Sequence, residues 1–127
     1  MSKKVISTAK LAKPGGPYSQ AILAGNLLFV AGTVATNERG EVVGLGDIKA
    51  QTRQTLENIK AAIEAAGGTM RDVTRTTVYL TDFASYAGMN EVYAAYFPVE
   101  PPARATVRAD LVHPKFLIEI EATALLG

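Results

Sequence analysis

The segment Phe116-Leu117-Ile118-Glu119-Ile120-Glu121-Ala122-Thr123-Ala124-Leu125 carries apolar residues at all its even positions. Successive side chains of a β-strand point to opposite faces. The even positions therefore form one apolar face, and Glu119 and Glu121 lie on the other. This pattern predicts a strand that packs one face on a core and keeps carboxylates on the opposite face of the sheet.

The segment Ala103–Ala109 predicts another strand, joined to the first by a turn that contains a proline. If the two strands pair as a hairpin, cross-strand partners sum to roughly 225 in residue number. That register brings Arg104 near Glu121 and Thr106 near Glu119. One face of the hairpin would then carry two guanidinium groups and two carboxylates.

The rest of the chain predicts four more strands and two helices. Asp47 is suited to cap the first helix and Gly67-Gly68 to end it, because glycine adopts the left-handed conformation without steric cost. Ser85 is a candidate cap for the second helix, which Pro98 ends. The strands are expected at Lys3–Thr8, Tyr18–Leu23, Leu27–Val34 and Val73–Thr81, and the helices at Asp47–Ala66 and Ser85–Phe97.

This order of elements predicts an α+β fold in a single domain over residues 1–127. Two helices cannot cover both faces of a six-stranded sheet, so they are expected to pack on one face. The other face, with the charged cluster among apolar groups, then meets water or another copy. An apolar content of 48% and a mean hydropathy of +0.13 favour cover by a partner.

The composition excludes several classes of function. Thirteen Lys and Arg against twelve Asp and Glu give a net charge of +1, so a nucleic-acid or membrane surface built on bulk charge is not expected. The chain has no Cys and one His, His113, and it lacks phosphate-loop, dinucleotide and metal-ligand motifs. Chemistry without a bound cofactor or metal is expected. No export signal is visible, so a cytoplasmic location is expected.

Four side chains are candidates for chemistry, and each has a plain alternative. Arg104 could bind a small carboxylate bidentately, or it could pair with Glu119 or Glu121 on a solvated sheet face. The two glutamates could be a general acid and base, or simply salt-bridged. Tyr18 follows Pro14-Gly15-Gly16-Pro17 and could donate its hydroxyl into a site, or its ring could cap the core. Spacing alone leaves these alternatives open.

Several segments, in order along nearly the whole chain, resemble the reactive intermediate deaminase A family, also called the YjgF or endoribonuclease L-PSP family. The most specific are Pro102–Val107 and Ile118–Ala122. The others are Gly16–Ala21, Leu28–Gly32, Gln51–Lys60 running to Ala65–Gly67, Thr77–Asp82 and Asn90–Tyr93.

The resemblance implies a chorismate-mutase-like fold that assembles as a homotrimer, with active sites in clefts between subunits. It implies that Arg104 binds the substrate carboxylate and that Glu119 and Tyr18 position the attacking water. Asn90 is implied to line the same cleft, and Glu121 to support structure. These implications agree with the uncovered sheet face expected above.

The resemblance also places Ala31, Gly32 and Thr106 in the substrate site. The family's deaminases usually have Ser in place of Ala31, Gln in place of Thr33 and Cys in place of Thr106. The implied activity is hydrolysis of short 2-imino or 2-enamino acids to 2-oxo acids and ammonia. The alternatives are a non-catalytic module that binds small carboxylates or protein clients, and a single-stranded RNA endoribonuclease.

Overall fold

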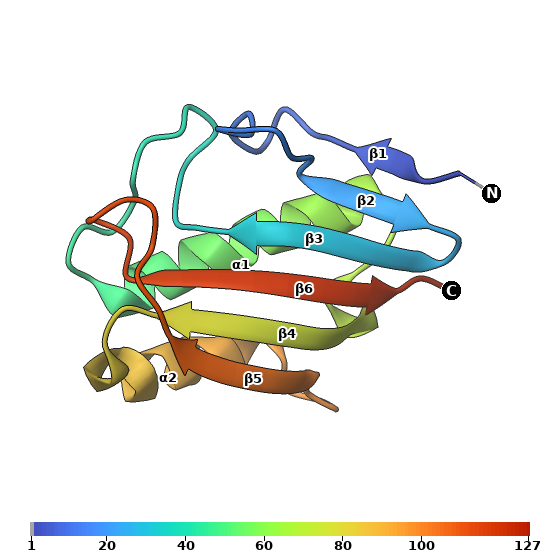
Figure 1. Ribbon diagram of the computed structural model, residues 1–127. Coiled ribbons are helices and arrows are strands. Elements are labelled where there is room, and N and C mark those ends of the chain that lie inside the picture. The colour runs from blue at the N-terminus through green and yellow to red at the C-terminus, as the bar shows by residue number, and fades with distance from the viewer. Residues whose placement is uncertain (1) are drawn as a thin grey trace.

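Strand β6 (Ile118–Leu125) lies in the middle of a six-stranded sheet in the computed structural model, which describes residues 2–127 (Figure 1). Both helices lie behind the sheet in that view, on one of its faces. The other elements are β1 (Lys4–Ile6), β2 (Ala21–Ala24), β3 (Leu27–Thr33), α1 (Ile48–Ala65), the 3-10 turn η1 (Met70–Asp72), β4 (Val73–Leu80), the 3-10 turn η2 (Phe83–Ser85), α2 (Tyr86–Tyr96) and β5 (Ala103–Arg108).

The sheet has the strand order β1-β2-β3-β6-β4-β5. All neighbouring pairs are antiparallel except β4 and β5, which run parallel because α2 connects them as a crossover. The sheet is therefore mixed, and the α+β class expected from the sequence is confirmed.

The expected hairpin between the last two strands is wrong. Strand β4 lies between β5 and β6, so Arg104 pairs with Thr76 and not with Glu121. Thr76 is buried beneath the helices, and paired residues of neighbouring strands share a face. Arg104 and Thr106 thus lie on the helix side of the sheet, whereas Glu119 and Glu121 lie on the uncovered side.

Burial explains why β6 takes the central position. Its four even residues are almost fully buried beneath the helices, at 0–4% exposure, whereas much of β5 is exposed. The long connection 109–117 lets the chain pass the end of β4 and insert β6 next to β3. Placing β6 at an edge would forfeit the contacts of its apolar face with the core.

Local signals at the helix ends are confirmed with one exception. The Asp47 side chain accepts a hydrogen bond from the Ala50 amide at 3.1 Å, and Gly67 follows α1 with a φ of 89°. Ser85 makes no capping hydrogen bond with its side chain, contrary to expectation. It ends η2 instead, whose first turn is capped by Asp82 through the Ala84 amide.

A buried amide on α1 fastens the connection that leads into β6. Gln51 is fully buried, and its Nε2 donates to the carbonyls of Lys115 at 2.9 Å and Gly44 at 3.2 Å. Its Oε1 accepts from the Leu117 amide at 2.9 Å. All polar atoms of this side chain are therefore paired, as a buried amide requires.

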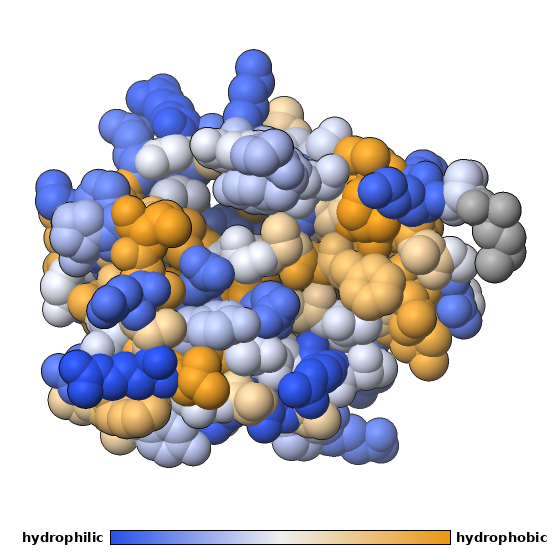
Figure 2. All heavy atoms as spheres, in the orientation of Figure 1, coloured by the Kyte–Doolittle hydropathy of each residue, from blue (hydrophilic) through white to orange (hydrophobic). Residues whose placement is uncertain are grey.

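The sheet face opposite the helices carries exposed apolar side chains. Val5, Ile22 and Phe29 are paired across β1, β2 and β3, and Leu27 pairs with Leu125 of β6. Figure 2 shows this face, with apolar side chains gathered toward the β2–β3 hairpin. Within residues 2–127, no helix is both long and apolar enough to cross a membrane.

The hydroxyl of Thr55 yields a stability prediction. Among residues 2–127 it is the one buried side-chain oxygen or nitrogen without a hydrogen-bond partner. Leaving such a group unpaired costs about 1–3 kcal/mol. We expect Thr55→Val to raise the free energy of unfolding by about 1 kcal/mol, measured by urea denaturation.

The control is Thr52→Val on the same helix. Thr52 is equally buried, but its hydroxyl donates to the Ile48 carbonyl at 2.7 Å. No gain is expected there, because the substitution removes a made hydrogen bond. Equal gains for both variants would show that the hydroxyl of Thr55 is not the cause.

Candidate functional site

The residues singled out by the sequence fall into two groups on opposite faces of the sheet. Within one chain, the structure brings the members of each group together but does not join the groups. The arginine group comprises Arg104 and Thr106 of β5 with Asn90 of α2, and the carboxylate group comprises Tyr18, Ala31, Gly32 and Glu119.

Arg104 is held by side chains of α2. Its Nη2 donates to the Tyr86 hydroxyl at 3.0 Å, and its Nη1 lies 3.9 Å from the Met89 sulfur. Its Cζ stands 4.7 Å from the centre of the Tyr93 ring and 5.6 Å from that of Tyr86, both within cation–π range. These contacts hold the guanidinium in place without neutralising it.

No carboxylate pairs with Arg104. Over residues 2–127, the one ion pair joins Lys49 and Glu91. The interpretation of Arg104 as a partner of Glu119 or Glu121 is therefore wrong, because those side chains lie on the other face. A half-buried guanidinium with no counter-charge is suited to bind an anion from outside the chain.

Asn90 and Arg104 meet at the hydroxyl of Tyr86. Hydrogen bonding by Asn90, followed by the positive charge of Arg104, lowers the pKa of Tyr86 below its usual value. The sequence had not marked Tyr86 as a site residue. Its spacing from Asn90 and Tyr93 is the signal that could have found it, since residues four and seven apart share one helix face.

Glu119 packs on the backbone of Gly32. A β-carbon added at Gly32 would lie 2.3 Å from Oε2 of Glu119, so only glycine leaves room for the carboxylate. Burial raises the pKa of Glu119, and the negative charge of Glu121 raises it further. A carboxyl group whose pKa is raised in this way holds a proton more readily than an exposed one, as a general acid or base requires.

Glu121 is already occupied in the fold. The Tyr79 hydroxyl donates to its Oε1 at 2.5 Å, and this hydrogen bond is the main cause that raises the pKa of Tyr79. The geometry fits a supporting role for Glu121. Glu119 is then the carboxylate that packs on Gly32, and Gly32 lines the same pocket as Tyr18.

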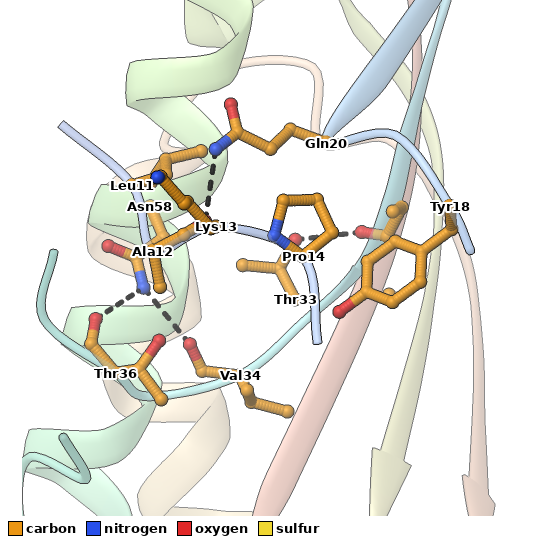
Figure 3. Close-up of a pocket in the computed structure, with 12 residues that line it drawn as sticks. Leu11, Ala12, Lys13, Pro14, Tyr18, Gln20, Thr33, Val34, Thr36 and Asn58 are labelled. Atoms are coloured by element: carbon orange, nitrogen blue, oxygen red, sulfur yellow. Dashed lines mark hydrogen bonds between the residues drawn. The ribbon is translucent and has the colours of Figure 1, made fainter. Parts of the chain in front are cut away.

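A pocket of about 80 Å³ adjoins the carboxylate group (Figure 3). Tyr18, Ala31 and Gly32 form part of its wall, and the segment Leu11–Pro14 forms another part. Gln20 fastens that segment, because its Nε2 donates to the carbonyls of Ala12 at 3.0 Å and Thr8 at 3.3 Å. The pocket therefore has fixed walls beside the predicted site residues.

The described chain offers no evident metal-binding cluster. Among residues 2–127, no three or more His, Asp or Glu side chains gather as metal ligands would. His113 lies in the turn before β6, where its Nδ1 accepts from the Lys115 amide at 3.1 Å.

The chain is similar to known proteins over nearly its whole length. The family model described as endoribonuclease L-PSP matches residues 8–126. A RutC family protein of Pyrococcus horikoshii is 55% identical over 123 residues, which cover 96% of this chain and 97% of that protein.

Two solved structures share the fold. RidA from the Antarctic bacterium Psychrobacter sp. superposes with a TM-score of 0.90 at 36% identity, over 97% of this chain and 99% of its own. TdcF of E. coli with bound serine superposes with a TM-score of 0.90 at 33% identity, over 98% and 99% of the two chains.

The environment of Glu119 predicts a pH-dependent effect on stability. Its pKa in the folded state lies above that of an unfolded chain, about 4.3. The native state therefore binds the proton more tightly, and stability is lost as the pH rises through this window. We expect the unfolding free energy of Glu119→Gln, relative to the wild type, to rise as the pH increases above about 4.3 and then to level off.

Denaturation at matched protein concentration over that range measures this difference. Glu64→Gln, on the exposed face of α1, is the control for loss of one negative charge. A difference for Glu119→Gln that is flat with pH, or that the control reproduces, would contradict the assigned cause.

Proposed function

Because the chain belongs to the endoribonuclease L-PSP family, the Rid/YjgF family, we propose that it hydrolyses short 2-imino and 2-enamino acids to 2-oxo acids and ammonia. The observation that carries the proposal is the unpaired guanidinium of Arg104. It is fixed in place and has no internal carboxylate, so a substrate carboxylate can supply the missing charge.

The reaction needs water at the imine carbon. A protonated imine is already electrophilic, so orientation and proton transfer are the main requirements. As the water oxygen bonds to this carbon, Glu119 accepts the water's proton and a carbinolamine forms. Glu119 then returns the proton to nitrogen, so that the C–N bond breaks and ammonia leaves as the C=O bond forms, and the hydroxyl proton passes to the Glu119 carboxylate and from there to solvent. Tyr18 helps to place the water, and Gly32 and Ala31 border the substrate.

The two groups of residues act together only if separate copies supply them. Arg104, Asn90 and Thr106 of one copy face the carboxylate group of another in this proposal. The homotrimer implied by the family resemblance provides such clefts. The exposed apolar side chains on the sheet face opposite the helices support burial against another copy.

A second candidate is a module that binds small carboxylates without catalysis. The relative TdcF with bound serine favours this alternative, since serine is an amino acid and not an imine. Ala31, Thr33 and Thr106 stand where the family's deaminases usually have Ser, Gln and Cys. These three differences also favour binding without catalysis. Ligand binding without faster imine decay would favour the module over the enzyme.

The family's endoribonuclease label gives a third candidate, which the chain supports less. A net charge of +1 offers little attraction for a phosphate backbone. RNA left intact by metal-free, highly purified protein would remove this candidate.

The role of Arg104 predicts a large kinetic effect. Arg104→Ala should lower kcat/KM for 2-iminobutanoate about a hundredfold, or about 3 kcal/mol of transition-state stabilisation. Ammonia release coupled to an amino-acid dehydratase measures it. Arg108→Ala, on the same strand, is the control and should keep the wild-type rate. An unchanged rate in Arg104→Ala would falsify the assigned role.

A shared site also predicts complementation. Arg104→Ala and Glu119→Gln, each weakly active alone, should recover activity when co-expressed with different tags and purified as mixed assemblies. The reason is that some clefts then receive an intact half from each variant. Mixed assemblies no more active than the average of the two variants, or a monomer in sedimentation at micromolar concentration, would exclude the shared site.

A further inference from the structure

The hydroxyl of Tyr86 has a proton that no group in the described structure accepts. Its oxygen accepts the N–H of Arg104 at 3.0 Å, and the Tyr86 hydroxyl donates to no side chain or carbonyl of residues 2–127. A phenol has one proton to donate and can accept hydrogen bonds as well. Because Arg104 is the donor in this contact, the proton of the Tyr86 hydroxyl remains available to a ligand.

Two other tyrosines of the chain donate their protons to carboxylates. Tyr79 donates to Glu121 and Tyr96 donates to Glu57, at 2.5 and 2.6 Å. Tyr86 has no such carboxylate partner. It is 42% exposed, so a ligand can reach its hydroxyl.

We propose that Tyr86 is a second binding residue for the substrate carboxylate, donating its O–H to an oxygen that Arg104 also holds. This inference rests on the proposed function, and it adds a residue that the family resemblance did not mark. Because Oη of Tyr86 lies 3.0 Å from Nη2 of Arg104, both donors can reach one carboxylate group.

The surroundings of Arg104 favour that approach. Met89 and the ring of Tyr93 occupy other sides of the guanidinium and carry no negative charge. The remaining N–H groups stay available beside Tyr86. The lowered pKa of Tyr86 supports the same role, since a more acidic phenol is a better hydrogen-bond donor.

The arrangement selects for a free carboxylate over its amide or ester. Arg104 and Tyr86 both present donors, and an ionised carboxylate accepts with both oxygens. A carboxamide would turn its own N–H₂ group toward one of these donors. The ligand class that fits is therefore a small organic acid with an unmodified carboxylate beside its reacting carbon.

The test measures binding of 2-oxobutanoate, the proposed product, by calorimetry. Tyr86→Phe removes only the hydroxyl, and we expect Kd to rise at least tenfold, because a hydrogen bond to a charged group is worth about 1.5–3 kcal/mol. The matched control is Tyr96→Phe on the same helix, which should leave Kd unchanged. Circular dichroism checks that both variants fold.

A second ligand separates direct contact from mere positioning of Arg104. For 2-oxobutanamide, loss of the hydroxyl should weaken binding less, because a hydrogen bond to a neutral amide oxygen is weaker than one to a carboxylate. Equal weakening for the acid and the amide would overturn the inference. So would a Kd for the acid within twofold of wild type.

The outcomes for the two proposals remain distinguishable. If wild-type protein neither binds 2-oxobutanoate nor releases ammonia from the imine, the proposed function fails. If Arg104→Ala abolishes binding and Tyr86→Phe leaves it unchanged, only the role of Tyr86 fails. A crystal structure of the complex with Oη of Tyr86 beyond about 3.5 Å from the carboxylate would also overturn it.

Discussion

The buried amide of Gln51 joins segments of the chain that are far apart in the sequence. Its three hydrogen bonds join α1 to the Gly44 carbonyl and to both sides of Phe116, just before β6 begins. A second buried amide on α1, Asn58, donates to the carbonyls of Val34 and Thr36 after β3. The helix thus fixes where the chain leaves β3 and where it enters β6, and Glu119 is the second residue of β6. The candidate site depends on these two anchors.

Local signals predicted the elements well, because they depend on short stretches of sequence. Alternation found β6, apolar spacing found α1, and Asp47 and Gly67 marked the ends of α1 within a residue. Strand pairing was predicted wrongly, because two strands adjacent in sequence were assumed to be adjacent in the sheet. Strands β5 and β6 do not pair, because α2 crosses over and brings β5 back as a parallel partner of β4. No property of the two strands alone contains that information.

The same distinction applies to the candidate site. The resemblance marked Arg104 and Glu119 by their local motifs, but the faces they occupy follow from the sheet order. The face that Arg104 occupies follows from its pairing with Thr76. Thr76 is buried on the helix side of the sheet, and its hydroxyl lies 2.6 Å from that of Tyr93 on α2. The side chains around Arg104 thus come from α2. The pairing expected from the sequence considered only neighbouring strands and left this helix out. The helical spacing of Tyr86 from Asn90 and Tyr93 was the one sequence signal for this residue, and its contact with Arg104 could be found only in the structure.

The central place of β6 has a consequence for synthesis of the chain. This strand follows all its neighbours in sequence, yet it joins β3 on one side and β4 on the other. Before β6 has been synthesised, β1–β3 and β4–β5 can form only as two separate sheets that are not hydrogen-bonded to each other. Each then has an open edge where β6 will later pair. Such edges readily pair with other chains. Both edges therefore stay open during synthesis until the last strand emerges and fills the gap between them.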